Sequence, residues 1–206
     1  MRIVCLSDTH DRLAEIQVPD GDVLVHAGDF TRGGDRDAVL AFATSLHELP
    51  HADKVVVAGN HDLLFEREPQ TGAALLGDVH YLCDSGVTID GLRFWGSPWQ
   101  PEFFDWAFNL PRGVALAEKW ALFPNDTDVL VTHGPPLGIL DRTVHGEDVG
   151  CEDLARAVER VRPRLHVFGH IHESHGRLER DGTTFVNASS CDVRYRPVQA
   201  TFVVDL

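Results

Sequence analysis

Five short apolar runs recur along the chain, and each ends abruptly in a cluster of glycine, aspartate, asparagine or histidine. Runs of this length without polar alternation are typical of strands that are buried on both faces. This feature constrains the fold more than any other, because each face of such strands must be covered by another layer. The runs occupy residues 3–6, 23–26, 55–57, 129–131 and 165–168.

Between these runs lie three stretches with apolar residues at helical spacing, namely 35–49, 114–122 and 151–161. Strands that alternate with helices predict a layered α/β fold, with helices flanking a core of two sheets. The pairs Asp90-Gly91 and Asp181-Gly182 are typical of hairpin turns. Further short strands are expected at residues 79–82, 87–89, 92–95, 184–186 and 201–204. Proline and glycine stand singly at turns and form no linker, so we expect one domain over residues 1–206.

The charge and cysteine content exclude several classes of protein. A formal net charge of -14 over 206 residues repels polyanions, so we expect no stable nucleic-acid partner. The four cysteines form no C-x-x-C pair, which argues against a disulfide framework or a structural zinc ribbon. They are Cys5, Cys83, Cys151 and Cys191. No feature of the sequence specifies an oligomeric state.

No apolar run is long enough to span a bilayer. The run at residues 3–6 reaches Asp8 too early to serve as the apolar segment of a secretion signal. We therefore expect a cytoplasmic protein that does not associate with membranes.

The polar clusters all follow their strands, and the carboxyl ends of strands in open α/β sheets are where ligands bind. Each cluster alone is also compatible with an ordinary turn, but five in order favour a site for two divalent ions. His26 and His166 lie inside their apolar runs, so we expect them to be hydrogen-bonded residues of the core and not ligands. The residues that reach the common edge are Asp8, His10, Asp29, Asn60, His61, His133, His170 and His172.

The ordered series resembles the signature of the calcineurin-like metallophosphoesterase superfamily. Its blocks are Asp8-x-His10, Gly28-Asp29, Gly59-Asn60-His61-Asp62, Thr132-His133-Gly134 and Gly169-His170-x-His172. The stretches 96–100, 106–113, 133–138 and 186–189 extend the resemblance to the metallophosphoesterase-domain-containing subfamily and over nearly the whole chain. The resemblance implies a four-layer α/β/β/α sandwich of two mixed sheets flanked by helices, with the active site at the strand carboxyl ends.

The resemblance also implies a role for each residue of the series. Asp8, His10, Asp29 and His172 would hold the first metal ion. Asp29, Asn60, His133 and His170 would hold the second, so that Asp29 bridges the two. His61 would be the catalytic residue that protonates the leaving oxygen or stabilises charge at phosphorus. Asp62 could orient His61 or cap a following helix.

The implied activity is hydrolysis of a small phosphodiester, such as a cyclic nucleotide, by a hydroxide that bridges the two ions. A phosphomonoesterase or nuclease using the same site, a nucleotide-binding protein without turnover and a non-catalytic interaction scaffold are the alternatives. The implied partner is a small-molecule phosphoester, a nucleotide among the candidates. Four aromatic residues in the second half of the chain could stack on a base, although aromatic residues near glycine and proline more often pack a loop. They are Trp95, Trp99, Trp106 and Phe108.

The predicted cofactors are two divalent transition-metal ions. Four histidines combined with oxygen ligands favour Mn, Fe, Zn, Co or Ni over Ca or Mg, and manganese is the expected ion.

Overall fold

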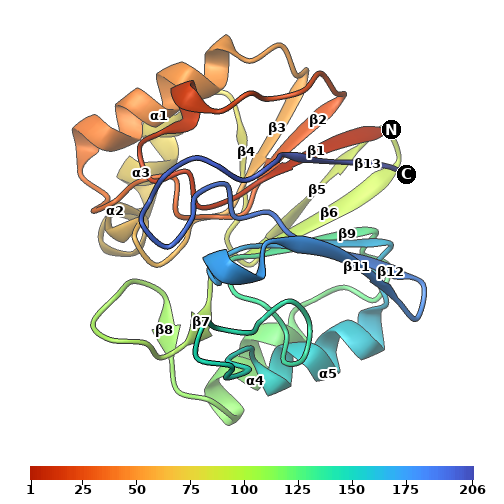
Figure 1. Ribbon diagram of the computed structural model, residues 1–206. Coiled ribbons are helices and arrows are strands. Elements are labelled where there is room, and N and C mark those ends of the chain that lie inside the picture. The colour runs from red at the N-terminus through yellow and green to blue at the C-terminus, as the bar shows by residue number, and fades with distance from the viewer.

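Two mixed sheets pack face to face, and helices cover the outer face of each (Figure 1). The computed structural model describes all of residues 1–206. The first sheet has the order β13-β1-β2-β3-β4, in which only β13 is antiparallel to its neighbour. Its strands are β1 (Arg2–Leu6), β2 (Val23–His26), β3 (Asp53–Val56), β4 (His80–Tyr81) and β13 (Phe202–Asp205).

The second sheet has the order β11-β12-β10-β9-β6-β5, with four parallel strands in the middle and an antiparallel strand at each edge. The edge pairs β5–β6 and β11–β12 are the hairpins predicted at Asp90-Gly91 and Asp181-Gly182. Its strands are β5 (Ser85–Ile89), β6 (Leu92–Ser97), β9 (Val129–Thr132), β10 (Leu165–Phe168), β11 (Gly176–Arg180) and β12 (Thr183–Asn187). A separate short pair joins β7 (Gln100–Pro101) to β8 (Asn109–Leu110).

The central strands are buried on both faces, as their uninterrupted apolar runs predict. In β1, Ile3 and Cys5 pack into the core between the sheets, whereas Leu6 packs against the helices outside the first sheet. Full burial of one large aliphatic side chain contributes about 1.5–3 kcal/mol. Because every central strand contributes to two cores in this way, the strands are held rigidly and their ends are fixed in space.

Helices complete the four layers. Those on the first sheet are α1 (Arg36–Glu48), α2 (Leu63–Arg67) and α3 (Pro69–Leu76), and those on the second are α4 (Val114–Ala121) and α5 (Glu152–Val161). Helix α1 begins where the Asp35 carboxylate accepts a hydrogen bond from the amide of Ala38, at 2.9 Å. Its apolar face, which includes Val39, Phe42 and Leu46, is buried against the first sheet. Short 3₁₀ helices at Leu13–Glu15 and His172–Ser174 lie in the loops.

The structure confirms the predicted α/β/β/α sandwich of two mixed sheets. All five central strands and the three expected helices are present with small shifts at their ends. The sequence pattern missed α2 and the β7–β8 pair, because elements this short contain no repeat of an apolar pattern. It missed α3 because the apolar residues of that helix are consecutive at its end and show no helical spacing.

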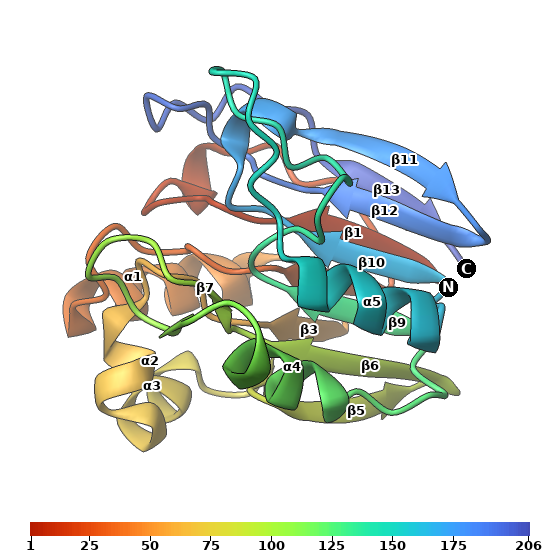
Figure 2. The same cartoon turned by 90° about the horizontal axis from the view of Figure 1, so that it is seen from below.

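The loops that follow the parallel strands gather on one side of the molecule, at the left of Figures 1 and 2. The two termini meet on the opposite side, where the Met1 amino group donates a hydrogen bond to the carbonyl of Leu206 at 2.7 Å. None of the helices combines the length and the apolar composition needed to cross a lipid bilayer.

Candidate metal centre

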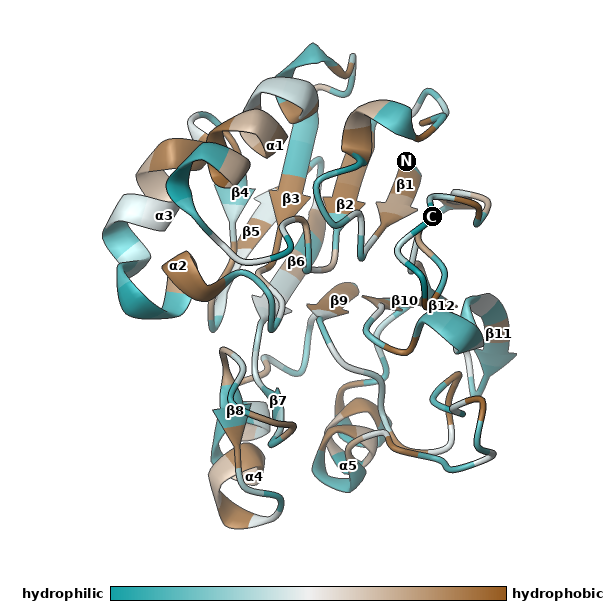
Figure 3. Ribbon diagram, turned by 60° about the vertical axis from the view of Figure 1, so that its left-hand side comes forward, coloured by the Kyte–Doolittle hydropathy of each residue, from teal (hydrophilic) through white to brown (hydrophobic).

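Apolar strands from both sheets end in polar loops around a common point, which is visible as the change from brown to teal in Figure 3. All seven candidate ligands meet there. Their donor atoms fall into two groups, each within 4.8 Å, formed by Asp8, His10 and His172 and by Asp29, His133 and His170. Asn60 joins the second group, since its Oδ1 lies 2.9 Å from Nε2 of His133. These two groups match the two ligand sets that the resemblance implies.

Asp29 lies between the groups. Its Oδ1 is 3.4 Å from Nε2 of His133, and its Oδ2 is 3.9 Å from Nε2 of His10. The two oxygens of one carboxylate therefore face different groups, which is the arrangement that a bridging ligand requires.

Three histidines have their tautomers set by main-chain carbonyls. Nδ1 of His133 lies 2.9 Å from the oxygen of Ala27, and Nδ1 of His172 lies 3.0 Å from the oxygen of Asp192. Nδ1 of His10 is 3.3 Å from the oxygen of Thr31. A carbonyl only accepts, so each Nδ1 carries the hydrogen and each Nε2 points a lone pair at the centre. This is the usual second partner of a metal-bound imidazole.

The donor set fits divalent cations. Nε2 of His10 lies only 3.3 Å from Nε2 of His172, which in turn is 3.2 Å from Oδ1 of Asp8. In the neutral form these three atoms are all acceptors in a site from which water is largely excluded, so a proton or a cation must lie among them. Nε2 of neutral His133 is also an acceptor, and it faces acceptor oxygens of both Asp29 and Asn60. A proton or a cation must therefore lie among these atoms too.

In each ligand group, a buried carboxylate raises the pKa of one neighbouring histidine. Burial alone would lower the pKa of His133, but the neighbouring Asp29 carboxylate raises that pKa to about 9. Burial also opposes protonation of His172, yet the Asp8 carboxylate raises its pKa to about 9. By contrast, burial lowers the pKa of His10 to about 4. One proton in each group thus partly compensates the buried carboxylate when no metal ion is bound.

The backbone is strained at the centre. Four of the seven candidate ligands have φ in the left-handed region, namely Asp8 (52°), His10 (44°), Asp29 (55°) and His170 (68°). Such angles are uncommon for residues other than glycine and persist where the surroundings enforce them, often at functional sites. Gly169 provides the space for Asp8, because a Cβ at position 169 would lie 2.0 Å from the Asp8 carboxylate.

His61 lies beside the centre, where its donor atom is within 4.8 Å of those of His10 and Asp29, and like three of the candidate ligands it turns Nδ1 to a main-chain carbonyl. Its Nδ1 lies 2.8 Å from the main-chain oxygen of Arg32, and its Nε2 lies 3.9 Å from Oδ2 of Asp29. The indole of Trp106 packs on the ring of His61 with 4.1 Å between centroids. The Trp106 loop is tied to the same segment, because the amide of Ala107 donates to the carbonyl of Asn60 at 3.1 Å.

Neither role considered for Asp62 is found. The carboxylate does not contact the ring of His61, and it forms no capping bond with α2. Instead it accepts four hydrogen bonds, from the amides of Asp29, Thr31 and Gly59 and from the Thr31 hydroxyl, at 2.8–3.0 Å. Asp62 thus joins the loop after β2 to the loop after β3. Burial and the nearby Asp29 carboxylate raise the pKa of Asp62 to about 7, whereas the four donors favour its ionised form.

The two histidines assigned to the core are confirmed as such. Nε2 of His26 lies 3.0 Å from the hydroxyl of Thr9, and Nε2 of His166 lies 2.9 Å from the hydroxyl of Thr132. Burial lowers the pKa of both imidazoles to about 3, so both are neutral. Each supports the residue next to a candidate ligand.

A cavity of about 590 Å³ opens onto the centre. Of the aromatic residues considered for base stacking, only Trp106 lines it. Trp95 lies in β6, Trp99 is bonded to Asp84 beneath the helix α4 side chain Lys119, and Phe108 is buried. The side chains of these three pack within the protein, which is the other alternative that their positions beside glycine and proline allowed.

Sequence reasoning missed Phe103, Phe104 and Tyr195, which also line the cavity. The two phenylalanines are 50% and 79% exposed, which is unusual for adjacent large apolar residues. Adjacent phenylalanines in a stretch with Glu102 and Asp105 were a usable signal, because apolar residues of a polar loop with no core to enter remain at the surface. Tyr195 had no comparable local signal.

Comparisons with known proteins identify the family and the fold. A family model described as calcineurin-like phosphoesterase matches residues 1–174. Metallophosphoesterase domain-containing protein 1 of Homo sapiens is 49% identical over 230 residues, which cover 100% of this chain and 71% of that protein. One solved structure, 17% identical, matches with a TM-score of 0.70 over 90% of this chain and 89% of its own. A structure described as an archaeal phosphodiesterase, 16% identical, matches with a TM-score of 0.50 over 100% of this chain and 93% of its own. At these identities the two structures are similar in fold alone.

Proposed function

This chain belongs to the calcineurin-like phosphoesterase family, a family of metal-dependent phosphoester hydrolases, and on that premise we propose that it hydrolyses small phosphodiesters. Cyclic nucleotides are the first candidates among such substrates. We further propose manganese as the working ion and the cytoplasm as the location.

The lining of the cavity carries the proposal. It contains no lysine and no arginine, and it includes two carboxylates, Asp29 and Asp105. A phosphate monoester carries up to two negative charges near neutral pH, whereas a diester carries one. A wall without cationic side chains therefore disfavours the monoester more strongly than the diester.

The apolar part of the lining supports the same choice. Phe103, Phe104, Trp106, Val193 and Tyr195 surround the entrance to the centre. A diester brings organic groups on both sides of its phosphorus, and these groups need an apolar surface on which to lie. Planar groups such as nucleobases stack favourably on aromatic side chains. We assign this role to Phe103 and Phe104, because Trp106 already packs against His61.

Seven residues would hold the metal ions. Asp8, His10 and His172 with one oxygen of Asp29 form one set, and His133, His170 and Asn60 with its other oxygen form the second. When bound, two divalent ions supply Lewis acidity, which acidifies a water and neutralises charge on phosphoryl oxygens. The carboxylate and amide oxygens of these sets suit manganese, whereas the imidazoles also suit iron, zinc and nickel.

The side chain of His61 would act as a general acid. Because Nδ1 donates to the Arg32 carbonyl, Nε2 is the nitrogen that faces the cavity. In the imidazolium form, Nε2 carries the hydrogen that the leaving oxygen of the ester requires. Trp106 and the Arg32 carbonyl hold the ring in this orientation from two sides.

The test is a paired substrate assay on metal-free protein reconstituted with one metal at a time. Bis(p-nitrophenyl) phosphate and p-nitrophenyl phosphate share a leaving group and differ in the ester type. We expect kcat/KM to be at least tenfold higher for the diester, with manganese the most effective ion. A preference for the monoester with every metal would contradict the proposal and favour a phosphomonoesterase.

A second comparison tests the aromatic wall. Phe103→Ser with Phe104→Ser should raise KM for a cyclic nucleotide more than for dimethyl phosphate, which has nothing to stack. Leu122→Ser and Val144→Ser are controls, because both side chains are exposed and neither lines the cavity. Equal effects on both substrates would remove the stacking role.

A further inference from the structure

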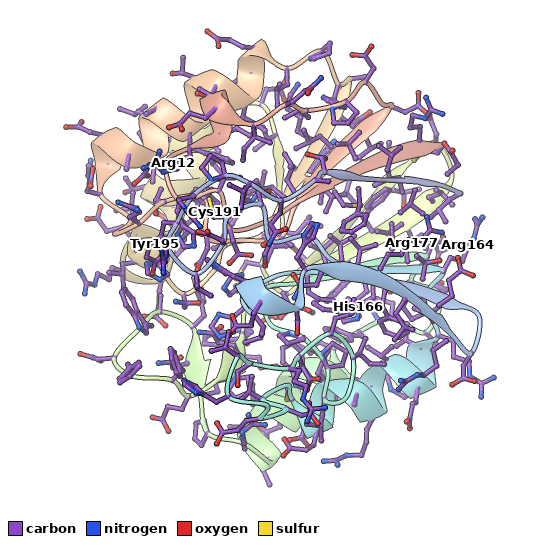
Figure 4. All side chains as sticks on the ribbon, in the orientation of Figure 1. Arg12, Arg164, His166, Arg177, Cys191 and Tyr195 are labelled. Atoms are coloured by element: carbon purple, nitrogen blue, oxygen red, sulfur yellow. The ribbon has the colours of Figure 1, made fainter.

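The loop of residues 188–201 between β12 and β13 places one tyrosine directly at the candidate metal centre. The ring of Tyr195 meets that of His10 edge to face, with 4.5 Å between centroids. It lies 5.9 Å from the ring of His172 and 6.2 Å from that of His61. Figure 4 shows Tyr195 on the loop side of the molecule, near Cys191 and far from Arg164 and Arg177.

This loop holds Tyr195 in a conformation that an aromatic residue rarely adopts. Its φ is 58°, in the left-handed region. The Asp192 carboxylate secures the turn by accepting hydrogen bonds from the amides of Arg194 and Arg196, at 2.9 and 3.0 Å. The carbonyl of Asp192 accepts from the Tyr195 amide at 2.8 Å and also faces Nδ1 of His172. The turn and the candidate ligand are therefore positioned by the same residue.

The ring is also held from its other side. The guanidinium of Arg32 lies over it, 4.8 Å from the centroid. The same residue accepts the Nδ1 hydrogen of His61 through its carbonyl. Arg32 thus contacts both residues, and Tyr195 is packed between Arg32 and His10. A ring packed on two sides loses little further freedom when substrate binds.

The hydroxyl of Tyr195, unlike its ring, does not help to hold the fold together. It forms no hydrogen bond within the protein, although Tyr195 lines the same cavity as Asp29, His61 and His172. It is also the only hydroxyl among the lining side chains. A phenol, whose ordinary pKa is about 10, is protonated at neutral pH and can donate.

We propose that Tyr195 is a catalytic residue whose hydroxyl donates a hydrogen bond to a non-bridging phosphoryl oxygen of the bound ester. The proposal rests on the phosphoesterase activity proposed above. The ring contacts the side of the centre formed by His10 and His172, where a phosphoryl group bound by the candidate metal ions would lie. His61 stands farther from Tyr195 and supplies the proton to the leaving oxygen. In a lining without lysine or arginine, a phenol donor stabilises phosphoryl charge without attracting the more highly charged monoesters.

Tyr195→Phe tests the proposal, because it removes the hydroxyl and keeps the ring that packs between Arg32 and His10. Tyr81→Phe is the matched control, since Tyr81 is the only other tyrosine and packs on Phe65 away from the cavity. We expect kcat/KM of Tyr195→Phe to fall about 10- to 100-fold, as for a lost hydrogen bond to a charged group. The fall should be equal for nitrophenyl and alkyl diesters, because the bond goes to a non-bridging oxygen. Metal content should stay at the wild-type value.

Inorganic phosphate serves as a probe that does not depend on turnover. Its dissociation constant from the metal-loaded protein should rise several-fold in Tyr195→Phe and remain unchanged in Tyr81→Phe. Unchanged kcat/KM and unchanged phosphate affinity would overturn the proposal. A loss confined to the alkyl ester would also overturn it, by placing the hydroxyl at the leaving oxygen, and loss of metal would show a structural role. A wild-type protein that hydrolyses neither ester type would refute the proposed function instead, while the phosphate measurement would still test Tyr195.

Discussion

Nδ1 of His61 lies 2.8 Å from the main-chain oxygen of Arg32, so the ring has one possible neutral tautomer and turns Nε2 toward the cavity. A main-chain carbonyl carries no formal charge, unlike a carboxylate partner, and it neither gives nor takes up a proton. It fixes the orientation of the ring. His61 is thereby prepared to donate from Nε2 when protonated, while the candidate metal ligands keep their own Nε2 atoms directed at the centre.

We predict that His61→Ala retains near-normal metal content and loses turnover by about 10²- to 10⁴-fold, as expected for a lost general acid. An activated nitrophenyl ester should lose less rate than a ribose diester, because a nitrophenolate leaves without being protonated. Metal analysis and kcat on both substrates measure this, with the exposed His145→Ala as control. Loss of one metal ion in His61→Ala would show that the residue is a ligand.

The two oxygens of Asp29 face different ligand groups, so we predict that Asp29→Asn weakens both metal sites. Asp8→Asn should weaken mainly one, because the imidazoles that the Asp8 carboxylate faces are those of His172 and His10, whereas it meets His170 only at the main-chain amide. Titration of metal-free protein should give two ions per chain for the wild type and for Asp205→Asn, an exposed control. Full activity after exhaustive chelation would exclude the dinuclear centre.

Metal binding should release protons, because the pKa values of His133 and His172 are raised to about 9 in the metal-free protein. At pH 7 both imidazoles then carry a proton that a metal ion must displace. Calorimetric titrations in buffers of different ionisation enthalpy measure the number released, and we expect it to approach two. A binding enthalpy that is independent of the buffer would contradict this prediction.

The same shifts predict how the stability of the metal-free protein depends on pH. A group with a folded-state pKa of about 9 and an unfolded value of 6.5 contributes stability that is fully present below pH 6.5. That contribution is lost as the pH rises through 9. The Tm of metal-free protein should therefore fall between pH 6.5 and 9, and His133→Gln should reduce the slope. Saturating metal should also reduce it, because the bound imidazoles are neutral throughout.

Asp62→Asn should destabilise the fold as well as the centre. In the variant an NH₂ group replaces one carboxylate oxygen of Asp62, and each of these oxygens accepts two hydrogen bonds. Two buried donors then face a third donor in place of an acceptor. We expect the free energy of unfolding to fall by about 1–3 kcal/mol and metal affinity to fall with it. Urea unfolding of metal-free protein measures the first effect separately. Asp141→Leu, which removes the buried acceptor of Gly138 and Gly150 outside the centre, should reduce stability without the same loss of metal affinity.

The sequence by itself determined the layers and the candidate ligands. Uninterrupted apolar runs such as residues 23–26 require cover on both faces, and the structure provides it in two cores. Asp8, Asp29 and His133 were recognisable because each follows such a run within three residues, where a parallel strand delivers it to the common edge. The structure brings these residues together with the other candidate ligands at that edge.

Only the tertiary structure decided which side chains line that edge and which side chains hold the candidate ligands in place. Asp62 joins two loops through main-chain donors, and Tyr195 reaches His10 across 185 positions of chain. Trp99 and Trp106 both lie in loop-like sequence, yet one packs beneath Lys119 and the other on His61. Apolar periodicity records whether a residue is buried within its own element. A contact between distant loops depends on where the rigid strands bring their ends, and no local pattern carries that information.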